Sequence, residues 1–217
     1  MKIPFWLKGH IDEQGLRRIR ESVSQAEAHT TGEIVPMIVK SSSPKHHIFG
    51  LLFLLLIATL DVALVITLSL LDVGHIVAIQ TAIILFSFAA AAGLSGLDFV
   101  HRILTPKFDR HHNAVVRAEL EFHRSQIRAT SSHTGALLFV SMMERQAVVL
   151  ADEKIAAKLG EHIWDEVLKT LSIGLREKDF AVGFSKAIEK VGKVLSEHYP
   201  ANEQSKNDLP NDLRILD

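Results

Sequence analysis

Two long apolar segments lie inside a chain that otherwise has the mixture of polar and apolar residues typical of a soluble α/β domain. They cover residues 48–71 and 73–97, and each is longer than the stretch of about 20 residues that a helix needs to cross the hydrocarbon core of a bilayer. Only the short link Asp72-Val73-Gly74-His75 joins them. The sequence therefore predicts a transmembrane hairpin in residues 48–100 that divides a polar domain in two.

The charge balance and the absence of cysteine exclude several classes of function. The 217 residues include 24 Lys and Arg and 25 Asp and Glu, so the chain has no excess of positive charge for binding nucleic acid. Without cysteine, disulfides, zinc–thiolate sites, iron–sulfur clusters and cysteine nucleophiles are ruled out. No glycine-rich loop that would bind a phosphate is found either, and nucleotide binding is not expected.

The positive charges near the apolar segments predict the orientation of the chain in a membrane. Lys40 and Lys45 precede the first segment, and Arg102, Lys107 and Arg110 follow the second, whereas the link has no Lys or Arg. Cytoplasmic loops are rich in these residues, so both termini are expected in the cytoplasm, with the anchor in the plasma (inner) membrane. The first residues lack the features of a signal peptide, and the first segment is expected to be a retained anchor.

A few polar residues lie within the apolar segments. Asp61 is near the middle of the first segment, where a carboxylate costs roughly 2.5–3.5 kcal/mol on insertion scales. A hairpin folded about Gly74 places Asp61 at the depth of Ser87 and brings Gln80 close to Thr67. Asp61 is then either a neutral, hydrogen-bonded packing residue or a functional group. As a functional group it would serve better in docking another membrane protein, together with Ser87 and Gln80, than as a proton relay.

Small residues are expected to bring the two helices of the hairpin together. They lie in the second half of the second apolar segment, where short side chains would let the two backbones approach closely. These residues are Ala89, Ala92, Gly93 and Gly96.

The polar residues predict an α/β domain formed by residues 1–47 and 101–199, followed by a polar tail, 200–217. Asp12 is expected to cap a first helix, and Pro36 in the next strand indicates an edge or a bulge. Residues 101–112 are expected to lie on the membrane surface. The remaining elements are a strand at 33–39, a helix at 113–130, strands at 136–142 and 147–151, and helices around 163–171 and 180–195. This order predicts a small mixed sheet flanked by helices, an α/β/α sandwich.

Several short motifs, in this order and spacing, resemble the TPM domain family. They are Thr31-Gly32-Glu33-Ile34, the run from Thr134 to Ser141, Glu144-Arg145, Ala151-Asp152-Glu153-Lys154-Ile155 and Asn207-Asp208-Leu209-Pro210. The resemblance implies an α/β/α sandwich, a divalent metal such as calcium at loops near the strand ends, and an acid-phosphatase activity. Relatives with the soluble layout often carry a signal peptide, so their compartment is not transferred to this chain.

Asp152 and Glu153, just past the third predicted strand, are the best candidates for calcium ligands because oxygen donors in a loop suit this ion. The alternative is that they form a solvated turn and the start of a helix. Glu33 and Glu144 match the family motifs, but structural roles are expected for both, with Glu144 in an exposed turn. No Asp-x-Asp pair follows a strand, so an aspartyl-phosphate mechanism is not supported.

The twelve histidines suggest a further possibility. His46-His47 and His111-His112 flank the two ends of the hairpin, where imidazoles could bind zinc or nickel or respond to pH. His162 is not part of a His-Glu-x-x-His zinc motif and is expected on the surface.

The function that these features favour is a membrane-anchored accessory or interaction domain. It would bind other membrane proteins during assembly, repair or quality control, with calcium as a ligand. A metal-dependent phosphatase is the alternative, and a metal or pH sensor built on the histidines is a third option.

Overall fold

The computed structural model describes residues 3–44, 46–68, 76–125, 127, 134–158, 161–202 and 209–217. The chain divides into two compact units, Met1–Ser42 with Arg110–Asp217, and Ser43–Asp109. The first contains a sheet with its covering helices, and the second contains the two apolar helices. The predicted α/β fold with two apolar helices between its two parts is confirmed.

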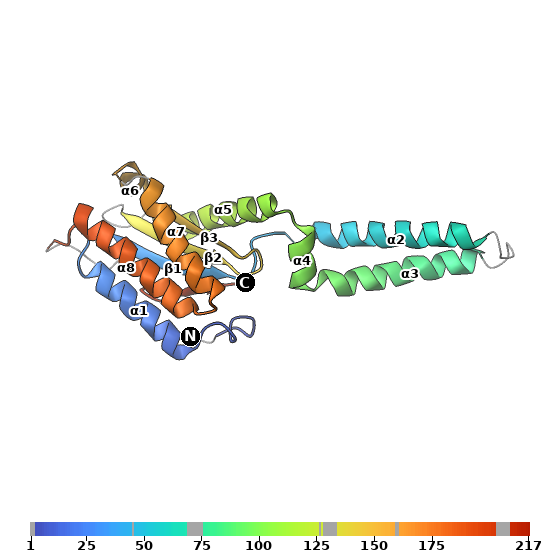
Figure 1. Ribbon diagram of the computed structural model, residues 1–217, viewed down its shortest axis with the longest axis horizontal. Coiled ribbons are helices and arrows are strands. Elements are labelled where there is room, and N and C mark those ends of the chain that lie inside the picture. Colours follow the sequence, from blue (N-terminus) through green and yellow to red (C-terminus); the bar gives the residue numbers. More distant parts are fainter. Residues whose placement is uncertain are drawn as a thin grey trace. The chain divides into compact units, whose positions relative to one another are not determined.

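Four strands form a mixed sheet in the order β3-β2-β1-β4 (Figure 1). β1 (Glu33–Val39) and β2 (Gly135–Ser141) pair in parallel along their whole length. β3 (Gln146–Ala151) pairs antiparallel with β2, and β4 (Arg214–Leu216) pairs in parallel with β1. The two central strands are therefore neighbours in space although the apolar hairpin separates them in sequence.

The fourth strand corrects one part of the sequence prediction. It lies in the segment 200–217, for which the sequence predicted a polar tail and no strand. Its three residues pair with Met37, Ile38 and Val39, and Leu213 just before it is buried in the core. A strand this short carries too few residues for an alternating pattern to be recognised in the sequence.

Pro36 lies in the part of β1 that pairs with β2 on one side but is not reached by β4 on the other. The N–H of Glu33 donates to Thr134 O on the β2 side at 3.0 Å, whereas the N–H of Lys40 donates to Leu216 O on the β4 side, also at 3.0 Å. Because successive residues alternate between the two sides, the nitrogen of Pro36 faces the β4 side, at a position that β4 does not reach. The missing N–H thus costs no bond of the ladder, as expected for an edge position.

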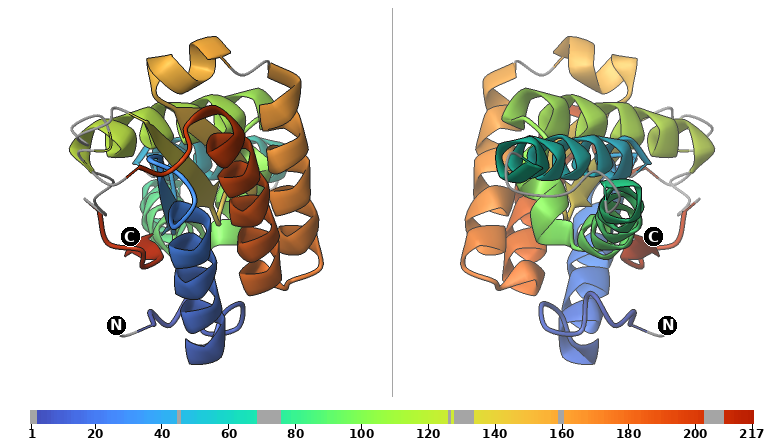
Figure 2. Two further views of the ribbon diagram at one scale, coloured as in Figure 1. Left: turned by 90° about the vertical axis from the view of Figure 1, so that its left-hand side faces the viewer. Right: turned by 90° about the vertical axis from the view of Figure 1, so that its right-hand side faces the viewer.

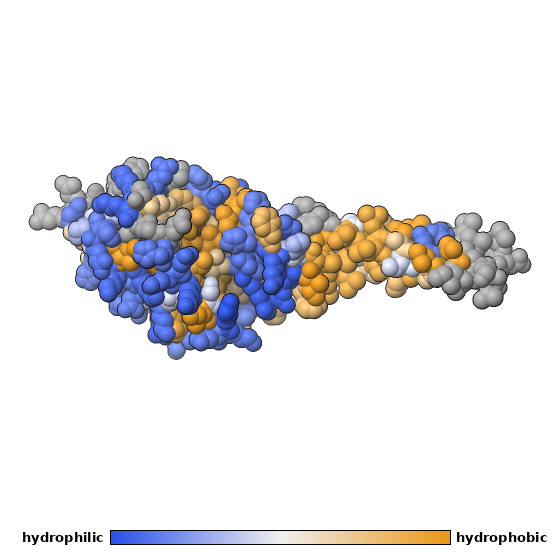
Figure 3. Space-filling model, turned by 45° about the horizontal axis from the view of Figure 1, so that its top comes forward, coloured by the Kyte–Doolittle hydropathy of each residue, from blue (hydrophilic) through white to orange (hydrophobic). Residues whose placement is uncertain are grey.

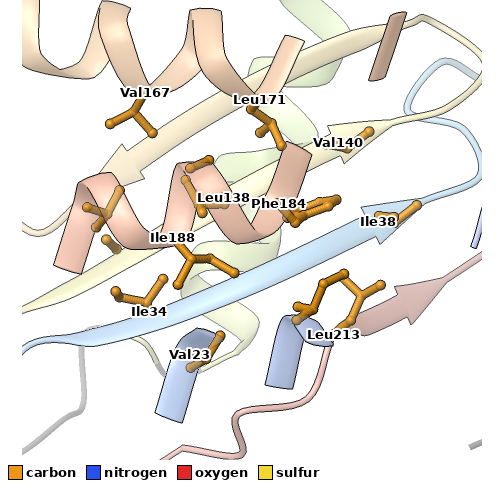
Figure 4. Close-up of a cluster of buried hydrophobic side chains, with 14 of the residues drawn as sticks. Val23, Ile34, Ile38, Leu138, Val140, Val167, Leu171, Phe184, Ile188 and Leu213 are labelled. Carbon is orange, nitrogen blue, oxygen red and sulfur yellow. The ribbon is translucent and has the colours of Figure 1, made fainter. Parts of the chain in front are cut away.

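One face of the sheet is covered by α1 (Glu13–Glu27), α7 (Glu161–Arg176) and α8 (Phe180–His198) (Figures 1 and 2). Alternate residues of β1 and β2 point into this layer, as the two-residue period of a strand requires. Figure 4 shows the packing of these side chains. The labelled residues are Val23, Ile34, Ile38, Leu138, Val140, Val167, Leu171, Phe184, Ile188 and Leu213.

The opposite face of the sheet is covered by α5 (Lys107–Arg124). Ala114, Ala118 and Phe122 of this helix pack against the other set of strand side chains, which includes Met37 and Phe139. Helices therefore lie on both faces, and the expected α/β/α arrangement is confirmed (Figure 2). The sequence predicted a later start for this helix, at Asn113.

A helix cap in α1 and two glycines in α7 and α8 determine how the helices on the first face of the sheet begin and pack. The carboxylate of Asp12 accepts the N–H of Gly15 at 2.7 Å, which confirms the predicted N-cap of α1. α7 and α8 approach so closely that a Cβ atom at Gly174 would lie 2.2 Å from the Cα atom of Gly183. No side chain fits at this crossing.

The second unit contains α2 (His46–Leu68), α3 (Ile76–Ser95) and the short α4 (Asp98–Leu104). The windows Ile48–Val65 and Ala78–Ser95 are long and apolar enough to cross a membrane, and only 11% of each is buried. Apolar residues dominate the surface of this pair of helices in Figure 3. The predicted link, residues 72–75, lies outside the described residues, and α4 was not predicted.

Candidate functional site

A side-chain hydrogen bond joins the two long helices of the hairpin. Nε2 of Gln80 in α3 donates to Oδ1 of Asp61 in α2 at 2.8 Å. The expectation that Asp61 lies at the depth of Ser87 is wrong, because Gln80 is about two helical turns away from Ser87 along α3. The contact between the rings of Phe53 and Phe88, with centroids 5.9 Å apart, follows the same register. A fold centred on Gly74 does not describe the pairing of these helices.

Ser87 lies on the face of α3 that packs against α2. It is fully buried, as is Ala91 one turn later, and this pair of short side chains allows the helices to approach. The four small residues predicted for this role are exposed or partly exposed instead, and a Cβ atom on Gly93 would meet no atom within 4 Å. Because small residues occur on two adjacent faces of α3, the sequence did not show which of these faces packs against α2.

The hydroxyl group of Ser87 has no hydrogen-bond partner among the described residues. Asp61 and Gln80 are each partly buried, and exposed apolar side chains surround them on the same helices, among them Val62 and Val65. Two of the three residues predicted for docking thus form a small polar site in an apolar hairpin. Gln80 and Asp61 are in direct contact, and Ser87 is separate from them.

Asp152 and Glu153 lie where β3 is followed by α6 (Glu153–Lys158). Asp152 is buried, and its Oδ2 accepts the N–H of Gly135 at 3.1 Å, while its carbonyl oxygen accepts the N–H of Ile155 at 2.9 Å. Glu153 is exposed in the first turn of α6. Asp152 therefore connects the start of β2 to the end of β3 and begins the helix.

Two carboxylates are fewer than the six to eight oxygen ligands that calcium takes. Within the described ranges, no group of three or more His, Asp or Glu residues is placed to hold a metal ion. Calcium binding at Asp152 and Glu153 stays a prediction. A calorimetric titration of the protein and of an Asp152→Ala variant tests it.

Glu144 is fully buried, which corrects the expectation of an exposed turn. Its two carboxylate oxygens each accept the N–H of Ser42 at 3.1 Å, and Oε2 also accepts the hydroxyl of Ser141 at 2.5 Å. The hydroxyl of Ser42 donates in turn to that of Ser141 at 2.8 Å. The exposed Arg145 that follows has a φ angle of 53° and completes the turn between β2 and β3. Glu144 fixes the chain just beyond the C-terminal end of β1.

A second buried carboxyl group lies at the opposite end of β1. Oε1 of Glu27 accepts the N–H of Ile34 at 2.7 Å, on the side of β1 that β4 does not cover. Burial raises the pKa of Glu27 to about 8, against the opposing effect of the hydrogen bond from Ile34 and with a further increase from the nearby Glu33. This role of Glu27 could not be predicted from the sequence, because its partner is a backbone group.

The predicted approach of His46-His47 to His111-His112 is not tested by the described residues. His111 contacts Gln146, with 3.2 Å between Nδ1 and Oε1, and His162 is exposed as expected. The side chains of His46 and His47 lie outside what is described. His101 alone among these residues is fully buried, and its Nε2 atom is 2.8 Å from the carbonyl oxygen of Ser95.

The fold and these contacts define a class of protein, an α/β sandwich whose sequence is interrupted by an apolar two-helix hairpin. Residues 100–194 match the family model of the TPM domain. The resemblance to the TPM domain family is therefore confirmed, over a range that includes β2, β3 and the helices after them.

Among solved structures, the chain is similar to the BA42 protein of the psychrophilic bacterium Bizionia argentinensis, determined by NMR. The sequences are 16% identical, the alignment covers 94% of each chain, and the TM-score is 0.59. At this identity the likeness concerns the fold alone. No match was found among curated proteins.

Proposed function

We propose that this protein is a membrane-anchored accessory module. In this proposal α2 and α3 cross the bilayer as a hairpin, and the protein binds other membrane proteins during their assembly or repair. The observation that carries the proposal is the hydrogen bond between Asp61 and Gln80, placed between two helices whose remaining surface is almost entirely apolar.

The exposure of the hairpin supports its insertion into a bilayer. The core helix of a soluble protein is mostly buried, whereas only 11% of each apolar window is buried here. Moving one large apolar side chain out of water is worth about 1.5–3 kcal/mol. Leu54, Val62, Val65, Leu85 and Phe86 are all exposed, and lipid would cover them without any change in the structure.

The polar pair supports a role in docking. A carboxylate has about four acceptor positions, and the bond from Gln80 occupies one of them. Such a group is expensive in lipid unless it finds further donors. A polar or positively charged residue on a neighbouring membrane protein would supply those donors. Asp61 would therefore favour binding of the hairpin to that protein.

The positive charges support an orientation with both termini in the cytoplasm. Lys40 precedes α2, and Arg102 and Lys107 follow α3, so all three lie outside the link that joins the two helices. The partners would then be reached from the cytoplasmic side through the α/β domain and within the membrane through the hairpin.

An Asp61→Leu substitution tests the docking role. A photoactivatable cross-linker introduced at Val62, which is exposed next to Asp61, records neighbouring proteins in native membranes. We expect defined cross-linked products with the unaltered Asp61 and a several-fold loss of those products with Asp61→Leu. An Asp61→Asn variant, which keeps the acceptor for Gln80 without the charge, separates the two contributions.

Thr59→Leu is the matched control. Thr59 is exposed on the same helix, and its hydroxyl bonds within that helix, to the carbonyl oxygens of Leu55 at 2.9 Å and Leu56 at 3.1 Å. Its removal should leave the products unchanged. Equal products from all variants would leave Asp61 with a packing role only. Hydrolysis of a generic phosphate ester by the purified protein would instead favour the phosphatase alternative.

A further inference from the structure

The short helix α4 runs crosswise to the two long helices of the hairpin (Figure 1). The chain leaves α3 through a tight turn in which the N–H of Leu97 donates to Leu94 O at 3.1 Å. The buried His101 then fixes α4 through its Nε2 atom, 2.8 Å from the carbonyl oxygen of Ser95 at the end of α3. The change of direction is thus built into the hairpin unit.

The outer side of α4 is apolar. Phe99 and Ile103 are four residues apart, which places them on one face of a helix, and their side chains are 61% and 63% exposed. Phe108, at the start of α5, is 79% exposed. These side chains lie within the same compact unit as α2 and α3.

Two basic residues lie near the exposed apolar residues of α4 in the sequence. The guanidinium carbon of Arg102 lies 5.7 Å from the centroid of the Phe99 ring, and Lys107 is exposed three residues after Leu104. Long basic side chains keep their charge in the polar layer while their stems cover apolar surface. Helices that lie in the plane of a membrane combine these two features.

We propose that α4 lies in the headgroup layer of the membrane, with Phe99 and Ile103 at the boundary of the acyl chains and Arg102 and Lys107 bound to lipid phosphates. The inference rests on the insertion of the hairpin proposed above. If α2 and α3 cross the bilayer, a helix crosswise to them lies along its surface. The basic residues then favour anionic lipids.

The absence of cysteine allows a direct measurement of depth. Single-cysteine variants Leu54→Cys, Phe99→Cys, Ile103→Cys and Lys193→Cys would each carry a nitroxide label in the full chain, reconstituted into vesicles of phosphatidylcholine and phosphatidylglycerol. Collision rates with oxygen and with a water-soluble nickel chelate report the depth of each label. All four sites are exposed, so the labels should not disturb folding.

We expect the label at residue 54 in the acyl chains, the label at 193 in water and the labels at 99 and 103 at the level of the headgroups. If 99 and 103 are as accessible to the chelate as 193 while 54 is protected, the position of α4 is wrong and the insertion stands. That outcome would also favour a protein partner for this face. If 54 is accessible as well, the proposed insertion itself fails.

A second comparison tests the lipid chemistry. Changing to pure phosphatidylcholine should move the labels at 99 and 103 toward water, by at least a two-fold increase in chelate collisions. Combined Arg102→Gln and Lys107→Gln substitutions should abolish this dependence on lipid charge, whereas Arg17→Gln and Arg18→Gln on exposed positions of α1 should preserve it. Equal depth in both lipids with the native charges would overturn the phosphate contacts.

Discussion

Glu27 illustrates how the fold changes the chemistry of a single residue. Its carboxyl group accepts the N–H of Ile34, on the side of β1 where β4 does not reach. The same position removes the group from water, and burial raises its pKa to about 8. The protonated, neutral form is therefore the one that suits the folded protein near neutral pH.

This shift predicts a dependence of stability on pH. Between the model-compound pKa of 4.5 and the folded pKa of about 8, the folded state binds more protons at Glu27 than the unfolded state does. The contribution of Glu27 to the free energy of unfolding is thus highest below pH 4.5, and it falls as the pH rises to about 8. A Glu27→Gln variant, which keeps a neutral acceptor for Ile34, should lose this decline.

Denaturant unfolding of the protein in detergent, followed by tryptophan fluorescence over this pH range, gives the measurement. The native protein and Glu27→Gln should approach each other at the acid end and diverge by up to a few kcal/mol at the alkaline end. Glu21→Gln, at an exposed position of the same helix, is the control. Parallel curves for the native protein and Glu27→Gln would contradict the assigned pKa.

At the scale of elements, the sequence predicted the helices whose apolar residues repeat over several turns and the strands whose apolar residues extend along their whole length. The continuous run of apolar residues from Ala136 to Met142 indicated a strand covered on both faces, and the placement of Leu137 and Leu138 in the two different core layers agrees with this. The elements that were not predicted, α4 and β4, have seven residues or fewer, and the start of α6 at Glu153 was foreseen only as an alternative. Their positions depend on tertiary contacts, such as that of His101, which no local pattern records.

The crossing of α7 and α8 is an element-scale feature that a single methyl group should disrupt. Gly174→Ala would place a Cβ atom 2.2 Å from Gly183 and force the helices apart, so we expect a loss of about 1–3 kcal/mol in the free energy of unfolding. Gly9→Ala, where a Cβ atom meets nothing within 4 Å, should change stability by less than about 0.5 kcal/mol. Urea unfolding compares the two variants, and similar losses from both would contradict a tight crossing.

At the scale of the whole molecule, the sequence predicted which polar residues of the hairpin are candidates for a site, but not which of them are in contact. The sequence singled out Asp61, Ser87 and Gln80 because polar residues are rare in apolar segments. It did not fix which of them meet, because the register of a hairpin depends on the geometry of its link. The burial of Glu144 was missed for a similar reason, since its partner Ser42 is about a hundred residues away.

The proposed two-pass anchor makes a prediction for the complete chain. It should resist extraction from membranes by alkaline carbonate and be released by detergent. In intact cells, a membrane-impermeant thiol reagent should label a cysteine at His75, in the predicted link, and spare cysteines at Phe5 and Asp217 until the membrane is permeabilised. Labelling of only one of the two termini from outside would contradict a hairpin.

The parallel pairing of β1 with β2 has a consequence for biosynthesis. Paired residues such as Glu33 and Gly135 are about a hundred positions apart, so β1 is complete roughly 5–20 seconds before its neighbour emerges from the ribosome. If the apolar hairpin inserts into a membrane as proposed, both of its helices are synthesised during that interval, while β1 still lacks its central partner strand. Pairing of β1 with β2 would then follow insertion, and a failure of insertion would also delay the closure of the sheet.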